Sequence, residues 1–150
     1  MLTDFFERSN AIEECYEFML AYAAQGLPTD EGSQSGGKLR ELLGRAVEAL
    51  SALAENCAIA SGWEDFEEPE RYRAFCEVIY RDARDSLAAM ELVLSQPALS
   101  SQLIDNLNAS IHLRALLTDL FLLGEIIRSR SRSARPPALA DGAASQGAGP

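Results

Sequence analysis

Apolar side chains recur along most of this chain at intervals of three and four residues, which is the spacing of a helix with one buried face. The longest regular run lies between Lys38 and Ser61. Its apolar positions are Leu39, Leu43, Ala46, Leu50, Leu53, Cys57 and Ala60. No segment alternates apolar and polar residues in the manner of a half-buried strand. The pattern therefore predicts helices without a sheet.

Residues that favour helix ends mark two further helices. Asp4 and Glu7 have the spacing of a capping box at the start of the first helix, and Gly26 suits its end. Pro69 suits the first turn of another helix, because proline lacks an N–H that would be unpaired there. That helix is expected to continue to about Leu94.

A fourth helix is predicted to begin at Ser100 or Ser101 and to extend to about Ile127. Its second half is apolar on nearly every side, whereas a surface helix of a monomer keeps one broad polar face. We therefore expect a second copy of the chain to cover part of it. The side that we assign to this interface contains Leu113, Leu116, Leu120, Leu123 and Ile127. The other apolar side contains Ile104, Leu107, Ile111 and Phe121.

Residues 128–150 differ in composition from the rest of the chain. They are rich in Arg, Ser, Pro, Gly and Ala and hold few large apolar side chains, which predicts a disordered tail. Residues 1–127 then form a single folded domain. The expected fold is all-α: an antiparallel four-helix bundle with a disordered C-terminal tail.

The chain is acidic, with a formal net charge of −10. Residues 128–150 carry four arginines and one aspartate, a net +3, which leaves −13 for residues 1–127. An acidic body repels phosphates, so neither nucleic acid nor an anionic membrane surface is expected as a partner. No run of 18 apolar residues is present, so no membrane-spanning helix is expected. The lack of a signal peptide and the odd number of cysteines, three, predict a cytoplasmic protein with free thiols.

The stretch GSQSGGKL, residues 32–39, has the glycines and the lysine of a phosphate-binding loop. Such a loop places a hydroxyl residue after the lysine to bind Mg²⁺, whereas Leu39 follows Lys38 here. Asp30, just before the stretch, would repel phosphate. We therefore expect no nucleotide site, and residues 26–37 are predicted to be a flexible loop between helices.

Glu13, Glu14 and Glu17 form an E-E-x-x-E motif in the first helix. The motif resembles the first metal motif of the all-α nucleotide pyrophosphohydrolases of the MazG type. In that family a later E-x-x-D completes a Mg²⁺ site; Glu41 is the best-placed residue here, but Gly44 stands in place of the aspartate. The resemblance implies a metal-dependent enzyme with Glu13, Glu14, Glu17 and Glu41 as ligands. The alternative is a solvated acidic helix face, and we expect no cofactor.

The chain has a single histidine, His112. Acidic helical bundles of this size include histidine phosphotransfer domains, in which Leu, Lys and Gly follow the phosphoacceptor. The residues after His112 are LRALL, with Arg114 one position early and Ala115 in place of the glycine. The resemblance implies a phosphoacceptor role for His112, and a surface histidine is the alternative. In an up-and-down bundle His112 and the three cysteines fall into two layers, so no shared zinc site is expected.

The sequence thus favours a non-catalytic function. We expect a small assembly, adaptor or regulatory protein that acts through protein–protein contacts and forms a homodimer. The pyrophosphohydrolase and the phosphotransfer module remain the alternatives. The identity of a protein partner does not follow from the sequence.

Overall fold

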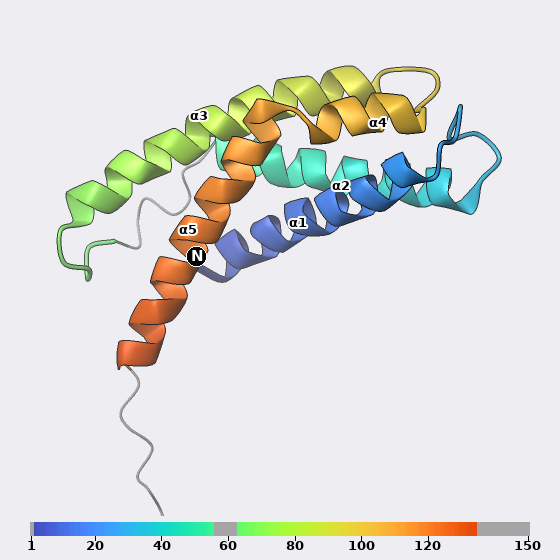
Figure 1. Cartoon of the computed structure of the whole chain (residues 1–150). Helices are drawn as coiled ribbons and strands as arrows, with labels where there is room; N and C mark the ends of the chain where they lie inside the picture. Colours follow the sequence, from blue (N-terminus) through green and yellow to red (C-terminus); the bar gives the residue numbers. More distant parts are fainter. Residues whose placement is uncertain (1, 56–62, 135–150) are drawn as a thin grey trace, which may run out of the picture.

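The computed structural model describes residues 2–55 and 63–134. These residues form five α-helices and no strand, which confirms the all-α prediction. The helices are α1 (Leu2–Ala24), α2 (Gln34–Glu55), α3 (Pro69–Leu94), α4 (Ser101–Asn108) and α5 (Ile111–Ala134). α2 packs against both α1 and α3, α4 lies on α1, and α5 lies mainly on α3. Successive long helices run in opposite directions, and α4 and α5 together take the fourth position of the bundle (Figure 1).

The single fourth helix predicted from the sequence is wrong, because the chain breaks it into α4 and α5. The last backbone hydrogen bond of α4 is the one that the N–H of Ala109 donates to the carbonyl of Asp105, at 3.1 Å. The backbone hydrogen bonds of α5 begin where the carbonyl of Ser110 accepts from the N–H of Arg114, at 3.2 Å. Asn and Ser side chains compete for backbone hydrogen bonds, so Asn108 and Ser110 suit helix ends. The break lets α4 lie along α1 while α5 crosses toward α3 (Figure 1).

α5 extends to Ala134, so residues 128–134 are helical and do not belong to a disordered tail as predicted. Two of their arginines lie over aromatic rings: the guanidinium of Arg128 is 4.8 Å from the ring centre of Phe6, and that of Arg130 is 4.6 Å from the ring centre of Phe66. Cation–π contacts of this kind favour an ordered side chain. The remainder of the predicted tail, residues 135–150, lies outside the described residues.

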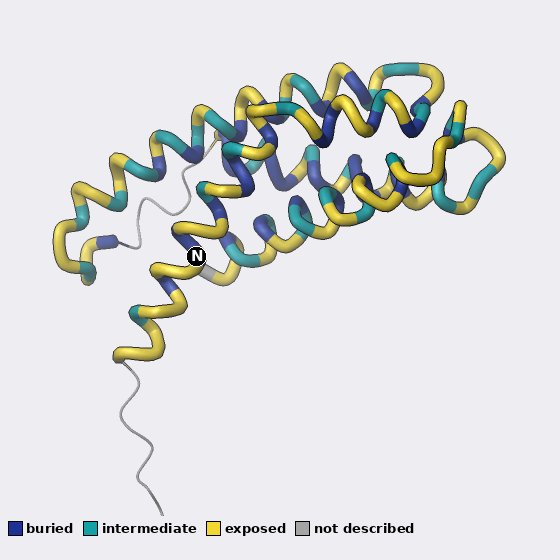
Figure 2. Tube along the Cα trace, in the orientation of Figure 1, coloured by how far each residue is buried: buried dark blue, intermediate teal, exposed yellow. Residues whose placement is uncertain are grey.

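Buried side chains line the inner faces of all the helices (Figure 2). The seam predicted for α2 is confirmed where the structure describes it, because its first five members are buried: Leu39, Leu43, Ala46, Leu50 and Leu53. Cys57 and Ala60, its last two members, lie outside the described residues. Trp63, in the connector before α3, is fully buried as well. The connector therefore contributes to the core.

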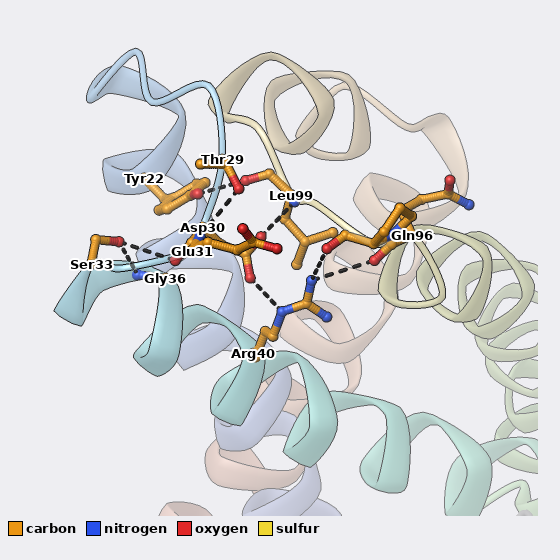
Figure 3. A network of polar contacts seen from close by, with 10 residues as sticks. Tyr22, Thr29, Asp30, Glu31, Ser33, Gly36, Arg40, Gln96 and Leu99 are labelled. Atoms are coloured by element: carbon orange, nitrogen blue, oxygen red, sulfur yellow. Dashed lines mark hydrogen bonds and ion pairs between the residues drawn. The ribbon is translucent and has the colours of Figure 1, made fainter.

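A network of hydrogen bonds joins the α1–α2 loop to the turn between α3 and α4 (Figure 3). Asp30 is only 6% exposed, and its carboxylate accepts from the backbone N–H of Leu99 at 2.7 Å and from Nε of Arg40. The hydrogen bond from Arg40 lowers the pKa of Asp30 below its ordinary value. The hydroxyl of Tyr22 donates to the carbonyl of Leu99 at 2.6 Å. Because a buried carboxylate must keep its partners, the network fixes a loop that was predicted to be flexible.

The glycine-rich stretch at residues 32–39 is mostly the first turn of a helix. α2 begins at Gln34, four residues before the predicted start at Lys38, and Ser33 Oγ accepts from the N–H of Gly36 at 2.9 Å. A Cβ on Gly36 would lie 2.0 Å from the backbone oxygen of Asp30, so only glycine fits there. The stretch thus serves as a helix start that packs against the loop before it.

Candidate interaction surface on α5

The five residues that the sequence analysis assigned to an interface lie inside the bundle. Leu113, Leu116, Leu120, Leu123 and Ile127 are all at most 3% exposed in the single chain. The packing of α5 on the neighbouring helices, above all α3, covers this side. A second copy would reach these side chains only by displacing the chain's own helices. The assignment is therefore corrected: this side of α5 belongs to the core of the protein.

The exposed apolar residues of α5 lie on a different side. Ile111 is 73% exposed, Leu122 is 51% exposed and Ile126 is 37% exposed. Together with the half-buried Ala115 they are separated by four, seven and four residues, which places them on one side of the helix. We call these four residues the apolar stripe. Phe121 is also 52% exposed, but its position in the helix places it on another side.

A groove of about 330 Å³ lies between the start of α3 and the second half of α5. Two members of the apolar stripe, Leu122 and Ile126, line it together with Phe75 of α3. Glu67 and Glu68, in the connector before α3, form an acidic part of its rim. Arg71 and Arg130 line the groove too, so it extends the apolar stripe toward α3 with a border of two acidic and two basic side chains.

Aromatic side chains fix the end of α5 to the connector beside this groove. The rings of Trp63 and Tyr72 stack with their centres 4.8 Å apart, and Phe66 lies against both. Arg130 of α5 lies over Phe66, and its Nη1 donates to the hydroxyl of Tyr72 at 2.6 Å. These contacts hold the end of α5 against the connector beside the groove.

The four glutamates of the candidate metal site do not face one common point. Glu14 reaches toward Arg45 of α2, with 4.0 Å between the nearest charged atoms. Glu13 lies on the side of Arg128 of α5. The pKa of Glu13 is raised, mainly by burial; Arg128 opposes this shift and Glu17 adds to it. Glu41, in α2, is exposed. Among residues 2–55 and 63–134, no group of three or more His, Cys, Asp or Glu side chains has the arrangement of a metal site.

His112 lies at the surface near the start of α5. Its Nδ1 is 3.8 Å from Oδ2 of Asp85 in α3, and both side chains are more than half exposed. Exposed pairs of this kind contribute little to stability. The position is open to solvent, but no described feature beside His112 distinguishes a phosphoacceptor from an ordinary surface histidine.

Two carboxyl groups meet between α3 and α5. Asp119 of α5 forms a hydrogen bond with Asp82 of α3, which requires that one of the two be protonated. The pKa of Asp119 is raised to about 7, mainly by burial and also by the neighbouring carboxyl group of Asp82. The second carboxyl oxygen of Asp119, Oδ2, is buried without a partner. This contact should therefore change its charge near neutral pH.

The described cysteines do not have the environment of a nucleophile. Cys15 is fully buried in α1, and burial raises the pKa of its thiol to about 12. A thiol with such a pKa stays protonated at neutral pH, and the thiolate is the reactive form. Cys76 of α3 is buried as well. Cys57 lies outside the described residues.

No helix within the described ranges is long and apolar enough to cross a membrane. No family model matches the chain, and no match was found among curated proteins or solved structures. The site must therefore be interpreted from its own geometry.

Sequence reasoning found the excess of apolar residues in α5 but selected the wrong side. The spacing of Ile111, Ala115, Leu122 and Ile126 was a signal for the exposed stripe. The aromatic cluster had a weaker signal, three aromatic residues within ten positions around Pro69: Trp63, Phe66 and Tyr72. Nothing in the local pattern indicated that Arg130, 58 residues away from Tyr72, would join them.

Proposed function

We propose that this protein is a small non-catalytic helical protein that acts through protein–protein contacts, and that it forms a homodimer through the apolar stripe of α5. The observation that carries the proposal is the exposure of Ile111, Leu122 and Ile126 on one side of a helix. Large apolar side chains contribute about 1.5–3 kcal/mol each on full burial. Scaled by the exposed fractions, covering the three side chains on both copies would contribute about 5–10 kcal/mol before the entropy lost on association.

The placement of the candidate catalytic groups supports a non-catalytic function. Glu13 and Glu14 face different neighbours, which separates the carboxylates that a shared Mg²⁺ would need. The thiol of Cys15 is buried and held protonated. We also propose a cytoplasmic location, which rests on the odd number of cysteines.

Sedimentation velocity and equilibrium at tens of micromolar test this proposal. The wild-type protein should sediment as a dimer, and Leu122→Glu should sediment as a monomer with unchanged helix content by circular dichroism. Leu92→Glu is the matched control, because Leu92 is 67% exposed on α3, away from the stripe, and this variant should remain a dimer. A wild-type monomer would contradict the proposed homodimer, and an equal effect of both substitutions would exclude the stripe as its interface.

A further inference from the structure

A titratable side chain lies beside the apolar stripe, halfway along it. Asp119 follows Ala115 by four residues and precedes Leu122 by three, so along the helix axis it lies between these two members of the stripe. At about 100° per residue, it lies about 20° around the helix from Ile126 and about 40° from Ala115. In the other direction around the helix, the next side chain is the buried Leu123. Asp119 therefore occupies the boundary between the stripe and the side of α5 that faces the protein.

The carboxyl group of Asp119 depends on a shared proton. Its hydrogen bond to the carboxyl group of Asp82 in α3 can form only while one of the two groups is protonated. Its second oxygen, Oδ2, is buried without a hydrogen-bond partner. Within the described ranges, neither Asp82 nor Asp119 forms an ion pair. The proton therefore does for this pair what a positive side chain does for most buried carboxylates.

The charged groups of α3 near the pair do not replace this proton. Asp85, three residues after Asp82, is also acidic, and its carboxylate is 3.8 Å from Nδ1 of His112 in α5. Arg81 precedes Asp82 in the chain, but it is exposed and pairs with neither carboxyl group. His112 is thus the other group on this side of α5 that can change its charge near neutral pH.

The remaining helices that contact α5, α1 and α4, place no positive charge beside Asp119 either. α1 packs on the opposite side, near Arg128, which lies about 180° around α5 from Asp119. α4 contains one charged residue, the exposed Asp105. Arg130 of α5 lies on the same side as Asp119, but it is about 16 Å further along the axis and bonds to Tyr72. Loss of the shared proton would therefore leave the pair with its negative charge uncompensated.

Covering the apolar stripe changes how strongly Asp119 holds a proton. Burial already raises the pKa of Asp119 to about 7 in the single chain. A second copy on the stripe would remove more water from this carboxyl group, and desolvation disfavours the charged form. The pKa of Asp119 is then higher in the dimer than in the monomer. By linkage, the dimer is strongest below pH 7 and weakens as the pH rises above this value.

We infer that protons control the self-association of this protein: two copies pair through the apolar stripe while Asp82 and Asp119 share a proton, and the pairing weakens when that proton is lost. This inference rests on the proposed homodimer and adds its regulation. As the dimer forms above pH 7, the Asp119 carboxylate of each copy takes up a proton from the solvent. Because desolvation acts whichever way the second helix runs, parallel and antiparallel arrangements have the same pH dependence.

Sedimentation equilibrium at pH 6 and at pH 8.5 tests the inference. The dissociation constant of the wild-type dimer should rise at least tenfold between them, because one linked proton changes it by up to about tenfold per pH unit. Asp119→Asn should dimerise equally well at both pH values. Its amide is uncharged and can donate to Asp82 in place of the shared proton. Circular dichroism at both pH values should show unchanged helix content, which separates dissociation from unfolding.

Two control variants identify the group that is responsible. Asp85→Asn removes an acidic side chain that is 59% exposed and lies outside the pair. His112→Gln removes the histidine. Both variants should keep the pH dependence of the wild type. If His112→Gln abolishes the pH dependence and Asp119→Asn does not, the histidine controls the dimer and the inference is overturned.

Infrared spectroscopy detects the shared proton directly. At pH 6 the wild type should show the C=O stretch of a protonated carboxyl group, which Asp119→Asn should lack and which should diminish at pH 8.5. Absence of this band at pH 6 overturns the inference in any oligomeric state. A dimer whose dissociation constant does not change with pH overturns the inference while the homodimer stands. A wild-type monomer at pH 6 contradicts the proposed homodimer, and the inference with it.

Discussion

Substituting alanine for Gly36 sets two opposing effects against each other at the start of α2. Alanine is the better helix former, which favours the folded state by about 0.5–1 kcal/mol. However, the added Cβ would lie 2.0 Å from the backbone oxygen of Asp30 and 2.7 Å from its carbonyl carbon. Non-bonded heavy atoms prefer separations of about 3.5–4.0 Å, so the backbone around Asp30 must move by more than 1 Å.

That movement affects a fixed part of the structure. The carboxylate of Asp30 holds the N–H of Leu99 and the guanidinium of Arg40, and hydrogen bonds to charged groups contribute about 1.5–3 kcal/mol. Forcing an extra methyl group into a packed site costs about 1–3 kcal/mol by itself. We therefore expect the clash to exceed the gain in helix propensity. Gly36→Ala should lower the free energy of unfolding by about 2–4 kcal/mol, which corresponds to about 5–15 °C in the midpoint of thermal unfolding.

Two neighbouring glycines of α2 provide matched controls. A Cβ on Gly37 or on Gly44 would meet nothing within 4 Å, so only the gain in helix propensity remains. Both substitutions should leave the stability unchanged or raise it by up to about 1 kcal/mol. Urea denaturation followed by circular dichroism at 222 nm measures all three variants. If Gly36→Ala proves as stable as Gly37→Ala, the close approach of α2 to Asp30 is refuted.

Two further substitutions test α5. Asp119→Asn removes a group whose pKa of about 7 lies above the 3.8 of a free aspartate. The stability that Asp119 contributes to the wild type is therefore full below pH 4 and is lost as the pH rises through 7. The difference between the two pKa values corresponds to at most about 4 kcal/mol. With partial solvent screening, we expect the free energy of unfolding of the variant to exceed that of the wild type by about 1–2 kcal/mol at pH 8 and to be almost equal to it at pH 4. Denaturation curves that show the same change at both pH values would contradict this. Leu120→Ala should destabilise the fold by about 2–5 kcal/mol, because Leu120 is 2% exposed, whereas Leu92→Ala should change stability by less than about 0.5 kcal/mol. A stable Leu120→Ala variant would show that this side of α5 does not face the core.

The sequence by itself determined the helical class and most helix positions, because these depend on local patterns. Pro69 marked the start of α3, and the spacing of apolar residues in α2 identified the side that faces the core. The break between α4 and α5 was not predicted, because Asn108 and Ser110 suit helix ends but do not by themselves force a helix to stop. After the break α4 contacts mainly α1 and α5 contacts mainly α3, which depends on where those helices lie in space.

The tertiary structure decided which part of the chain is available for function. A helical wheel gives the relative directions of Leu120 and Leu122 but not which of them faces the protein, and packing on α3 buried the first and left the second exposed. The fixed loop around Asp30 depends on Leu99, 69 residues away, so no local pattern could show it. Side-chain periodicity is a property of neighbours in sequence, whereas burial is a property of neighbours in space. The exposure of the apolar stripe that we propose as an interface therefore depends on how the helices pack together.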